Sequence, residues 1–176
     1  LVNNAGLALG LNKVQNNKQA DATTMMDTNV IGTIAFCSAF LPGMIERNCG
    51  HVINVGSIAG HYAYFMGSMY CASKYAINGF TLAARFDIAD TPLRITQISP
   101  GLVGNTEFSN VRFADDSKAS TVYDNIEALT PEDCADNIVY AATRPRHVQI
   151  ADIIMFCTNQ AAPRDIHRVG PSLGAK

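Results

Sequence analysis

The sequence predicts an α/β fold in which helices cover both faces of a parallel β-sheet. Short apolar runs rich in β-branched residues, at 1–2, 51–55, 93–98 and 153–156, alternate with longer segments of helical periodicity. Parallel strands need a crossover connection, which is usually a helix, so this alternation indicates parallel pairing. A length of 176 residues suits one domain, which we assign to 1–176.

Each predicted strand ends at residues that favour turns. Leu1-Val2 runs into the polar turn 3–6, and the strand 51–55 ends at Gly56-Ser57. The strand 93–98 follows Pro92 and stops at Pro100-Gly101. These stops place polar and small residues at the carboxyl ends of the strands, where open α/β sheets bind their ligands.

Three segments have the spacing or end signals of helices. Apolar residues recur at helical intervals over about 23–47, although Pro42-Gly43 is expected to bend or interrupt this segment. A second helix is predicted over 68–89, and a third over 131–143, where a proline and two acidic residues form the first turn.

The remaining segments are predicted to be irregular. A loop is expected over 58–67, and the polar stretch 102–120 is expected to be a mobile loop that covers the substrate. Residues 163–176 are expected to form a loosely held tail.

Composition argues against several classes of partner. The formal net charge of −2 gives no electrostatic case for nucleic acid, and no apolar run is expected to cross a membrane. Five scattered cysteines without a C-x-x-C pair fit reduced thiols in a cytoplasmic protein. The four histidines show no metal-binding spacing and Asp115-Asp116 reads as a solvated pair, so no catalytic metal is predicted.

The pattern most closely tied to chemistry is Tyr70 four residues before Lys74, with Ser57 upstream. Residues four apart lie on one face of a helix, so both side chains can point at one spot. A nearby ammonium favours the phenolate and lowers the pKa of a tyrosine, which can then exchange a proton with a substrate oxygen. Alone, this spacing arises by chance on many exposed helix faces.

Several motifs in order resemble the short-chain dehydrogenase/reductase family over essentially the whole chain. They are Asn3-Asn4-Ala5-Gly6, Asn29, Gly56-Ser57, Tyr70-x-x-x-Lys74 and Pro100-Gly101. The resemblance implies a Rossmann-like doubly wound fold and an NAD(P)-dependent oxidoreductase. It also implies a catalytic tetrad in which Tyr70 is the general acid/base and Ser57 orients the substrate oxygen. Lys74 would bind the nicotinamide ribose, and Asn29 would hold a water that links Lys74 to solvent.

The resemblance also implies residues that contact the cofactor. They are Asn3, Ala5, Gly6, Tyr70, Lys74, Pro100, Gly101, Val103 and Thr106. Where the family pattern is P-G-x-V-x-T, this chain has one extra residue before Thr106, which puts the register of that threonine in question. The added Gly104-Asn105 could equally be a flexible hinge.

A closer resemblance is to the NADP-dependent branch that oxidises 3-hydroxy acids such as serine, allo-threonine and 3-hydroxypropionate. It is carried by 1–10, Gly56–Gly60, the run Thr106–Phe113 and 158–161. A guanidinium binds a carboxylate through two parallel hydrogen bonds, so Arg112 is a candidate substrate anchor, and a solvated loop arginine is the equal alternative. A broad carbonyl reductase, or a non-catalytic scaffold, remains an alternative function.

The family's glycine-rich phosphate loop has no counterpart in this sequence. We therefore expect the chain to lack the first βαβ units of the fold, on the order of 80 residues. The residues that choose between NADP and NAD would lie there too, so NADP is expected and NAD is not excluded. The resemblance further implies a homodimer or homotetramer that contacts itself through the two long helices.

Overall fold

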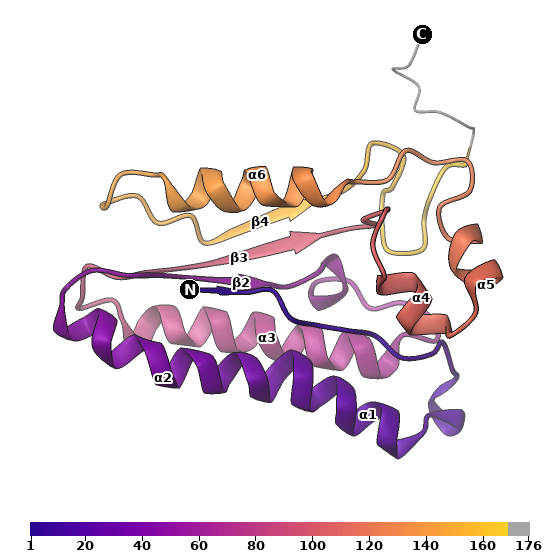
Figure 1. Cartoon of the computed structure of the whole chain (residues 1–176), viewed down its shortest axis with the longest axis horizontal. Helices are drawn as coiled ribbons and strands as arrows, with labels where there is room; N and C mark the ends of the chain where they lie inside the picture. The colour runs from indigo at the N-terminus through magenta and orange to yellow at the C-terminus, as the bar shows by residue number, and fades with distance from the viewer. Residues whose placement is uncertain (169–176) are drawn as a thin grey trace, which may run out of the picture.

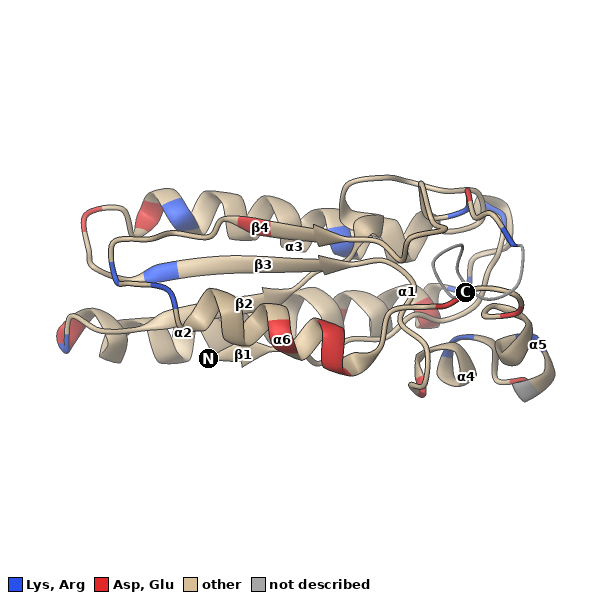
Figure 2. Cartoon of the chain, turned by 90° about the horizontal axis from the view of Figure 1, so that it is seen from above, with Lys and Arg blue, Asp and Glu red and all other residues tan. Residues whose placement is uncertain are grey.

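The computed structural model is described for residues 1–168 and contains one four-stranded parallel sheet. The strands are β1 (Val2–Asn3), β2 (His51–Val55), β3 (Arg94–Pro100) and β4 (Asp152–Met155), in the order β1-β2-β3-β4. Figure 2 shows them side by side. The register pairs Ile53 with Thr96 and Ser99 with Ile154. The predicted parallel α/β fold is therefore confirmed.

Helices cover both faces of the sheet (Figure 1). One face carries α1 (Gln19–Met26), α2 (Gly32–Glu46) and α3 (Ser68–Asp87), and the other carries α6 (Pro131–Ala142). The α6 helix begins with a capping box, in which Thr130 and Asp133 exchange hydrogen bonds across its first turn. Buried Cys37, Val52 and Ile95 form the core between the sheet and α2 and α3.

The first long helical segment differs from the prediction in three ways. It starts at Gln19, and α1 joins α2 through η2 (Asp27–Ile31), one turn of π-helix. Pro42, which was expected to bend or interrupt the segment, lies inside α2 without interrupting it. Ser38, whose carbonyl would accept from residue 42, is exposed, so that carbonyl can bind water instead.

The segment 19–46 also corrects the expectation about membranes. By length and composition alone, Gln19–Glu46 is a helix long and apolar enough to cross a membrane. One such helix is weak evidence, because the core helix of a soluble protein passes the same test. In this structure it packs against α3 and the sheet (Figure 1).

The segment 102–120 is not an irregular loop. It contains α4 (Phe108–Phe113) and α5 (Asp116–Thr121), joined at Ala114, whose φ is 48°. Asp115, which we read as a solvated acid, accepts from the backbone N–H groups of Ser117 and Lys118 and caps α5. The Ser117 hydroxyl also donates to Asp115 Oδ1, and this bond, followed by the bond from the Lys118 N–H, lowers the pKa of the Asp115 carboxyl. Short capped helices have too few turns to show periodicity, so the prediction missed them.

Two short turns complete the described elements. They are η1 (Val14–Asn16) and η3 (Ile58–Gly60), the second within the predicted loop 58–67. The predicted tail runs along the structure as far as residue 168, and its remainder, 169–176, lies outside the described residues.

Candidate active site

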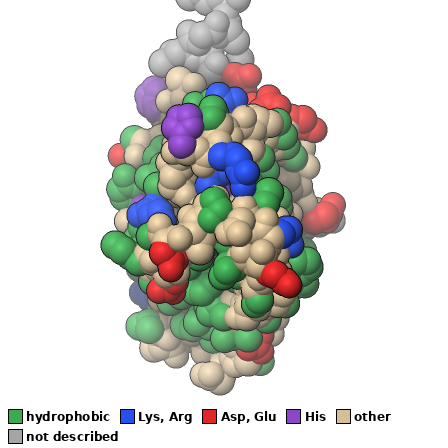
Figure 3. All heavy atoms as spheres, turned by 90° about the vertical axis from the view of Figure 1, so that its left-hand side faces the viewer, with side chains coloured by type: hydrophobic (Ala, Val, Ile, Leu, Met, Phe, Trp, Pro, Cys, Tyr) green, Lys and Arg blue, Asp and Glu red, His purple; other side chains and the backbone are tan. Residues whose placement is uncertain are grey.

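A cleft of about 970 Å³ opens at the carboxyl ends of the strands. Its walls include Val55–Ser57 from the end of β2, Pro100-Gly101 from the end of β3, and α4. In Figures 1 and 2 the arrowheads of β3 and β4 point to the end of the molecule where α4 and α5 lie. Figure 3 views the opposite end, where hydrophobic side chains are scattered among charged ones.

Tyr70 and Lys74 lie one turn apart on α3, as their spacing predicts, and both line the cleft. They are buried, with 8% and 6% of their surface exposed. The Lys74 Nζ donates to the Val55 carbonyl at 3.0 Å and lies 5.9 Å from the centroid of the Tyr70 ring. The β2 strand thus fixes the ammonium beside the phenol, between the helix and the sheet.

The structure does not support the expected lowering of the Tyr70 pKa. Burial raises the pKa of the Tyr70 hydroxyl, and the hydrogen bond with Ser57 opposes this rise only in part. Phe108 packs edge-on against the ring, with centroids 5.7 Å apart. Burial also lowers the pKa of Lys74 from 10.5 to about 8. Burial therefore disfavours the charged form of both side chains.

Ser57 stands at the N-cap of η3, directly after β2. Its hydroxyl accepts from the Ala59 N–H at 3.1 Å and donates to the Pro100 carbonyl at 3.4 Å. The second of these bonds is long and open to exchange for a ligand oxygen. Ser57 therefore lines the cleft with its hydroxyl between the ends of β2 and β3.

Asn29 lies behind the cleft rather than in its wall. Its Oδ1 accepts from the Leu7 N–H at 2.8 Å, and its Nδ2 donates to the Leu7 carbonyl at 2.8 Å and to Ser73 Oγ at 3.0 Å. The side chain therefore holds the turn after β1 against α3. A Cβ built on Gly6 would lie 3.3 Å from Asn29 Oδ1 and 3.5 Å from Lys74 Nζ. The part that Asn29 would play in a water-mediated proton path remains a prediction.

The expected cofactor residues divide into two groups. Gly6, Pro100, Gly101, Val103 and Thr106 line the cleft together with Tyr70 and Lys74. Asn3 and Ala5 do not. The Asn3 side chain is buried and donates to Asn54 Oδ1 at 2.9 Å, so it ties β1 to β2. Ala5 is exposed outside the cleft.

The extra residue before Thr106 is absorbed locally. Asn105 takes a left-handed conformation with φ of 55°, which asparagine tolerates better than most residues. The Gly104 N–H donates to the Leu129 carbonyl at 2.8 Å, an arrangement that disfavours the hinge alternative. Thr106 Oγ1 accepts from the Phe108 N–H at 3.4 Å while the residue still faces the cleft.

Arg112 lies on α4 in the wall of the cleft, not on a solvated loop. Its Nε donates to the Gly10 carbonyl at 3.2 Å and its Nη2 to Tyr64 Oη at 2.9 Å. The guanidinium carbon lies 5.4 Å from the centroid of the Tyr70 ring. A positive charge is thus fixed beside the phenol.

Sequence reasoning missed two further residues of the cleft. Tyr64, from the predicted loop 58–67, lies between Arg112 and Arg164, whose guanidinium carbon is 5.5 Å from the Tyr64 ring centroid. Arg164 belongs to the predicted tail 163–176, and the described part of that tail, 163–168, returns to the cleft. Neither residue has a local motif, so only the folded chain reveals them.

The arrangement fits a nicotinamide nucleotide. Lys74 has three N–H donors and a single hydrogen-bond acceptor among the described residues, which leaves donors for ribose hydroxyls. Gly6 and Gly101 keep the adjoining walls free of side chains, and a Cβ on Gly101 would overlap Gln160 Oε1. No group of three or more metal-ligating side chains occurs among the side chains that the structure describes.

Comparison with known proteins agrees with this chemistry. The family model described as short chain dehydrogenase matches residues 1–117. The NADP-dependent 3-hydroxy acid dehydrogenase of Salmonella typhi is 49% identical over 170 residues, which are 96% of this chain and 68% of that protein. The enzyme of the same name from Schizosaccharomyces pombe is 48% identical over 169 residues, which are 96% and 65% of the two chains.

Solved structures give the same result. The closed form of serine dehydrogenase complexed with NADP+ superposes with a TM-score of 0.91 at 47% identity, covering 96% of this chain and 69% of the other. Serine dehydrogenase from Escherichia coli gives a TM-score of 0.77 at 40% identity, covering 92% and 64%. With the family model matching well over half of it, this chain belongs to the short chain dehydrogenase family of oxidoreductases.

Proposed function

We propose that this chain carries the catalytic residues of an NADP-dependent oxidoreductase that acts on small 3-hydroxy acids. The observation that carries the proposal is the Arg112 guanidinium fixed 5.4 Å from the Tyr70 ring in one cleft. A proton-exchanging group and a carboxylate-binding group are what a hydroxy acid requires. Relatives that are 48% and 49% identical carry the name NADP-dependent 3-hydroxy acid dehydrogenase.

In this proposal Tyr70 exchanges the proton of the reacting oxygen. Because burial raises its pKa, the phenol keeps its proton at neutral pH and can donate it to the oxygen of a keto acid. Oxidation of the hydroxy acid requires the phenol to release that proton first. We therefore expect the oxidation rate to rise with pH above neutrality.

Ser57 and Lys74 support Tyr70 in different ways. Ser57 would exchange its long bond to the Pro100 carbonyl for the substrate oxygen and hold that oxygen at the phenol. The pKa of Lys74, about 8, lies close to neutral pH, so its ammonium can pass a proton onward when Tyr70 gives one up. A bound NADP would supply or accept the hydride, held by the ribose donors of Lys74 and the walls at Gly6 and Gly101.

Arg112 would anchor the substrate carboxylate. Its guanidinium has five N–H donors, of which the Gly10 carbonyl and Tyr64 hydroxyl take two. A charge-assisted bond in a buried site contributes roughly 1.5–3 kcal/mol. Arg164 provides a second, more exposed guanidinium on the other side of Tyr64.

The proposal is tested by measuring the substrate range of the natural protein that contains these residues. Serine, allo-threonine and 3-hydroxypropionate are compared with neutral alcohols of the same length, with NADP and with NAD. A kcat/KM preference of about tenfold or more for the acids would support the carboxylate contact. Equal values would favour the alternative, a broad carbonyl reductase, and loss of all turnover would favour a scaffold.

Two further properties belong to the proposal. Helices α2 and α3 expose large apolar side chains, namely Phe36, Phe40, Leu82 and Phe86, the last with 79% of its surface exposed. Such a face suits an isologous contact between two copies, so we propose a homodimer or homotetramer.

All five cysteines are free thiols, which is compatible with a reducing compartment, and we propose the cytoplasm.

A further inference from the structure

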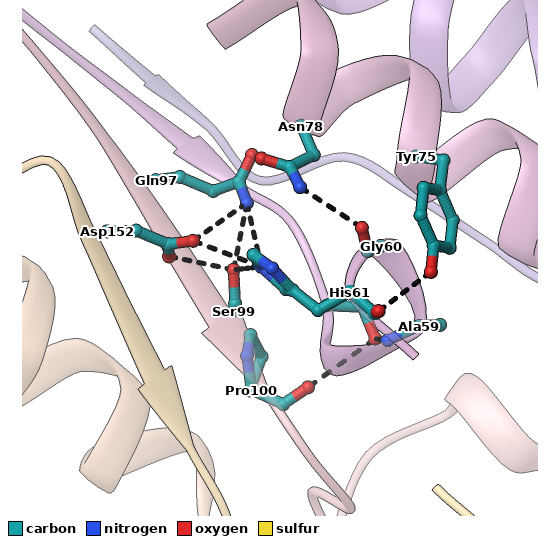
Figure 4. Close-up of polar contacts among 10 residues, drawn as sticks. Ala59, Gly60, His61, Tyr75, Asn78, Gln97, Ser99, Pro100 and Asp152 are labelled. Carbon is teal, nitrogen blue, oxygen red and sulfur yellow. Dashed lines mark hydrogen bonds and ion pairs between the residues drawn. The ribbon is translucent and has the colours of Figure 1, made fainter. Parts of the chain in front are cut away.

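A cluster of polar side chains lies behind the cleft, between the ends of the sheet and the turn that follows Ser57 (Figure 4). His61, the residue after η3, places its Nε2 3.0 Å from Ser99 Oγ and 3.0 Å from Asp152 Oδ2. Ser99 donates to Asp152 Oδ1 at 2.9 Å, and Gln97 Nε2 donates to Ser99 Oγ at 2.9 Å. Ser99 and Gln97 belong to β3, and Asp152 begins β4.

The hydrogen bonds of the cluster fix the direction in which His61 acts. Ser99 uses its only proton on Asp152, so its oxygen can only accept from His61. Asp152 is a carboxylate and also accepts. With Asp152 ionised, the Nε2 atom of His61 carries a proton, which it shares between two acceptors on two neighbouring strands. Its 3.3 Å approach to Gln97 Nε2 is then a contact between two donors. This makes His61 the donor that joins the turn to the sheet.

The same turn carries Ser57 at its other end. Backbone bonds run from the Gly60 N–H to the Ser57 carbonyl at 2.9 Å and from the His61 N–H to the Ile58 carbonyl at 3.0 Å. A shift of His61 is thus transmitted within one short turn to the serine that lines the cleft. The Gln97 side chain also lies under Gly56, where a built Cβ would meet its Cδ at 3.0 Å.

The turn is held from the helix side as well. Asn78 Nδ2 donates to the Gly60 carbonyl at 3.1 Å and Tyr75 Oη to the His61 carbonyl at 2.7 Å, as Figure 4 shows. A Cβ on Gly60 would collide with the Lys74 carbonyl at 2.6 Å, so the turn already packs against the backbone of α3. The contacts with α3 hold the turn near Tyr70 and Lys74. The bonds of His61 to Ser99 and Asp152 hold the same turn against β3 and β4.

We propose that His61, through its contact with Asp152 and Ser99, is a positioning residue that holds Ser57 in place for proton exchange with Tyr70. The inference rests on the proposed function. Neither His61 nor Asp152 lines the cleft, so neither touches the substrate. Their side chains are 17% and 25% exposed, which keeps the contact largely shielded from water.

The test compares two substitutions of His61 in the natural protein. His61→Gln keeps an N–H donor that can reach Asp152, whereas His61→Phe keeps the ring and loses the donor. Because a displacement near 1 Å costs on the order of 10²-fold in rate, we expect His61→Phe to lower kcat by about tenfold or more. We expect His61→Gln to keep at least about half of kcat, with NADP affinity unchanged in both. His147→Phe, at an exposed histidine, is the matched control and should have no effect.

A double-mutant cycle with Ser57 separates positioning from general stabilisation. If His61 acts through Ser57, His61→Phe should change kcat less than about twofold once Ser57→Ala has removed the hydroxyl. An equal loss in both backgrounds, or an equal loss for Gln and Phe at position 61, would overturn the inference. If His61→Phe does not fold, Asp152→Asn takes its place in the cycle, because it replaces one of the two oxygens that accept from Ser99 and His61 with an NH2 donor.

Failure of the proposed function has a different signature. Activity of the wild-type protein that is unaffected by Tyr70→Phe would remove the assigned chemistry before His61 is tested. Hydrogen exchange of the Ala59 and Gly60 amides then still measures whether His61→Phe releases the turn. Faster exchange in His61→Phe than in His61→Gln supports the positioning contact, and equal exchange refutes it.

Discussion

Lys74 is a buried cation, so its removal should stabilise the folded protein at neutral pH. Burial lowers its pKa from 10.5 to about 8. At pH 7 the lysine is charged in both the folded and the unfolded chain. At about 1.4 kcal/mol for each tenfold change in proton affinity, the depressed pKa then corresponds to roughly 3 kcal/mol of lost stability. Lys74→Met removes this penalty.

Part of the gain is offset by a lost hydrogen bond. Lys74→Met leaves the Val55 carbonyl without its 3.0 Å partner, which costs about 1 kcal/mol. The net stabilisation at pH 7 is therefore about 2 kcal/mol, or roughly 4–8 °C in Tm for a protein of this size. The penalty in the wild type fades as pH rises from the folded pKa of about 8 towards the unfolded value of 10.5. At pH 10 the gain should be close to zero, because the remaining penalty of about 1 kcal/mol only balances the lost bond.

Thermal unfolding of the natural protein without added nucleotide, at pH 7 and pH 10, measures this difference. Lys13→Met, at an exposed lysine, is the control and should show no comparable change with pH. A Lys74→Met protein that is less stable than wild type at pH 7, or a difference that does not change with pH, would refute the reasoning. The same variant should lose NADPH-induced stabilisation, because it lacks the ribose donors.

Four further outcomes are expected. Tyr70→Phe should keep the Tm and lower kcat on the order of 10²-fold or more, and a variant that keeps half the wild-type rate would contradict its role as the proton donor. Arg112→Leu should raise KM for serine about tenfold or more relative to a neutral alcohol of similar size. Arg164→Leu should have a smaller effect, because its charge is exposed. Phe86→Glu should dissociate the proposed dimer in light scattering, whereas an unchanged mass would exclude the α3 face from the contact.

The strands and the Tyr70–Lys74 pair could be predicted because their signals are local. Four apolar runs of β-branched residues gave the sheet, and the observed β2 is the predicted range 51–55. A spacing of four residues placed both side chains on one face of α3. The electrostatics could not be predicted in this way. The pKa of Tyr70 depends on burial by Phe108 and neighbouring chain, and this burial outweighs the charge that the spacing suggested.

Contacts between distant segments determine the parts of the site that were missed. Arg112 is held by Gly10, 102 residues away, and the Gly10 N–H donates back to the Arg112 carbonyl at 2.8 Å. This pair fixes α4 over the cleft, although the polar sequence around it shows no periodicity. Arg164 reaches Tyr64 across a similar separation. Such contacts leave no signature in a short window of the sequence. A mobile loop was therefore predicted where α4 and α5 fold, and a loose tail was predicted at 163–168, where the chain lines the cleft.

Asn29 shows how the site and the fold depend on each other. Its side chain spends both N–H donors and one acceptor position on Leu7 and Ser73, and so joins the turn after β1 to the helix that carries Tyr70 and Lys74. It projects from the π-helical turn η2, where one extra residue shifts the helix face by about 100° and re-aims the side chains that follow. The turn that Asn29 holds contains Gly6, and the lack of a side chain at Gly6 leaves the space beside Lys74 open for a ligand.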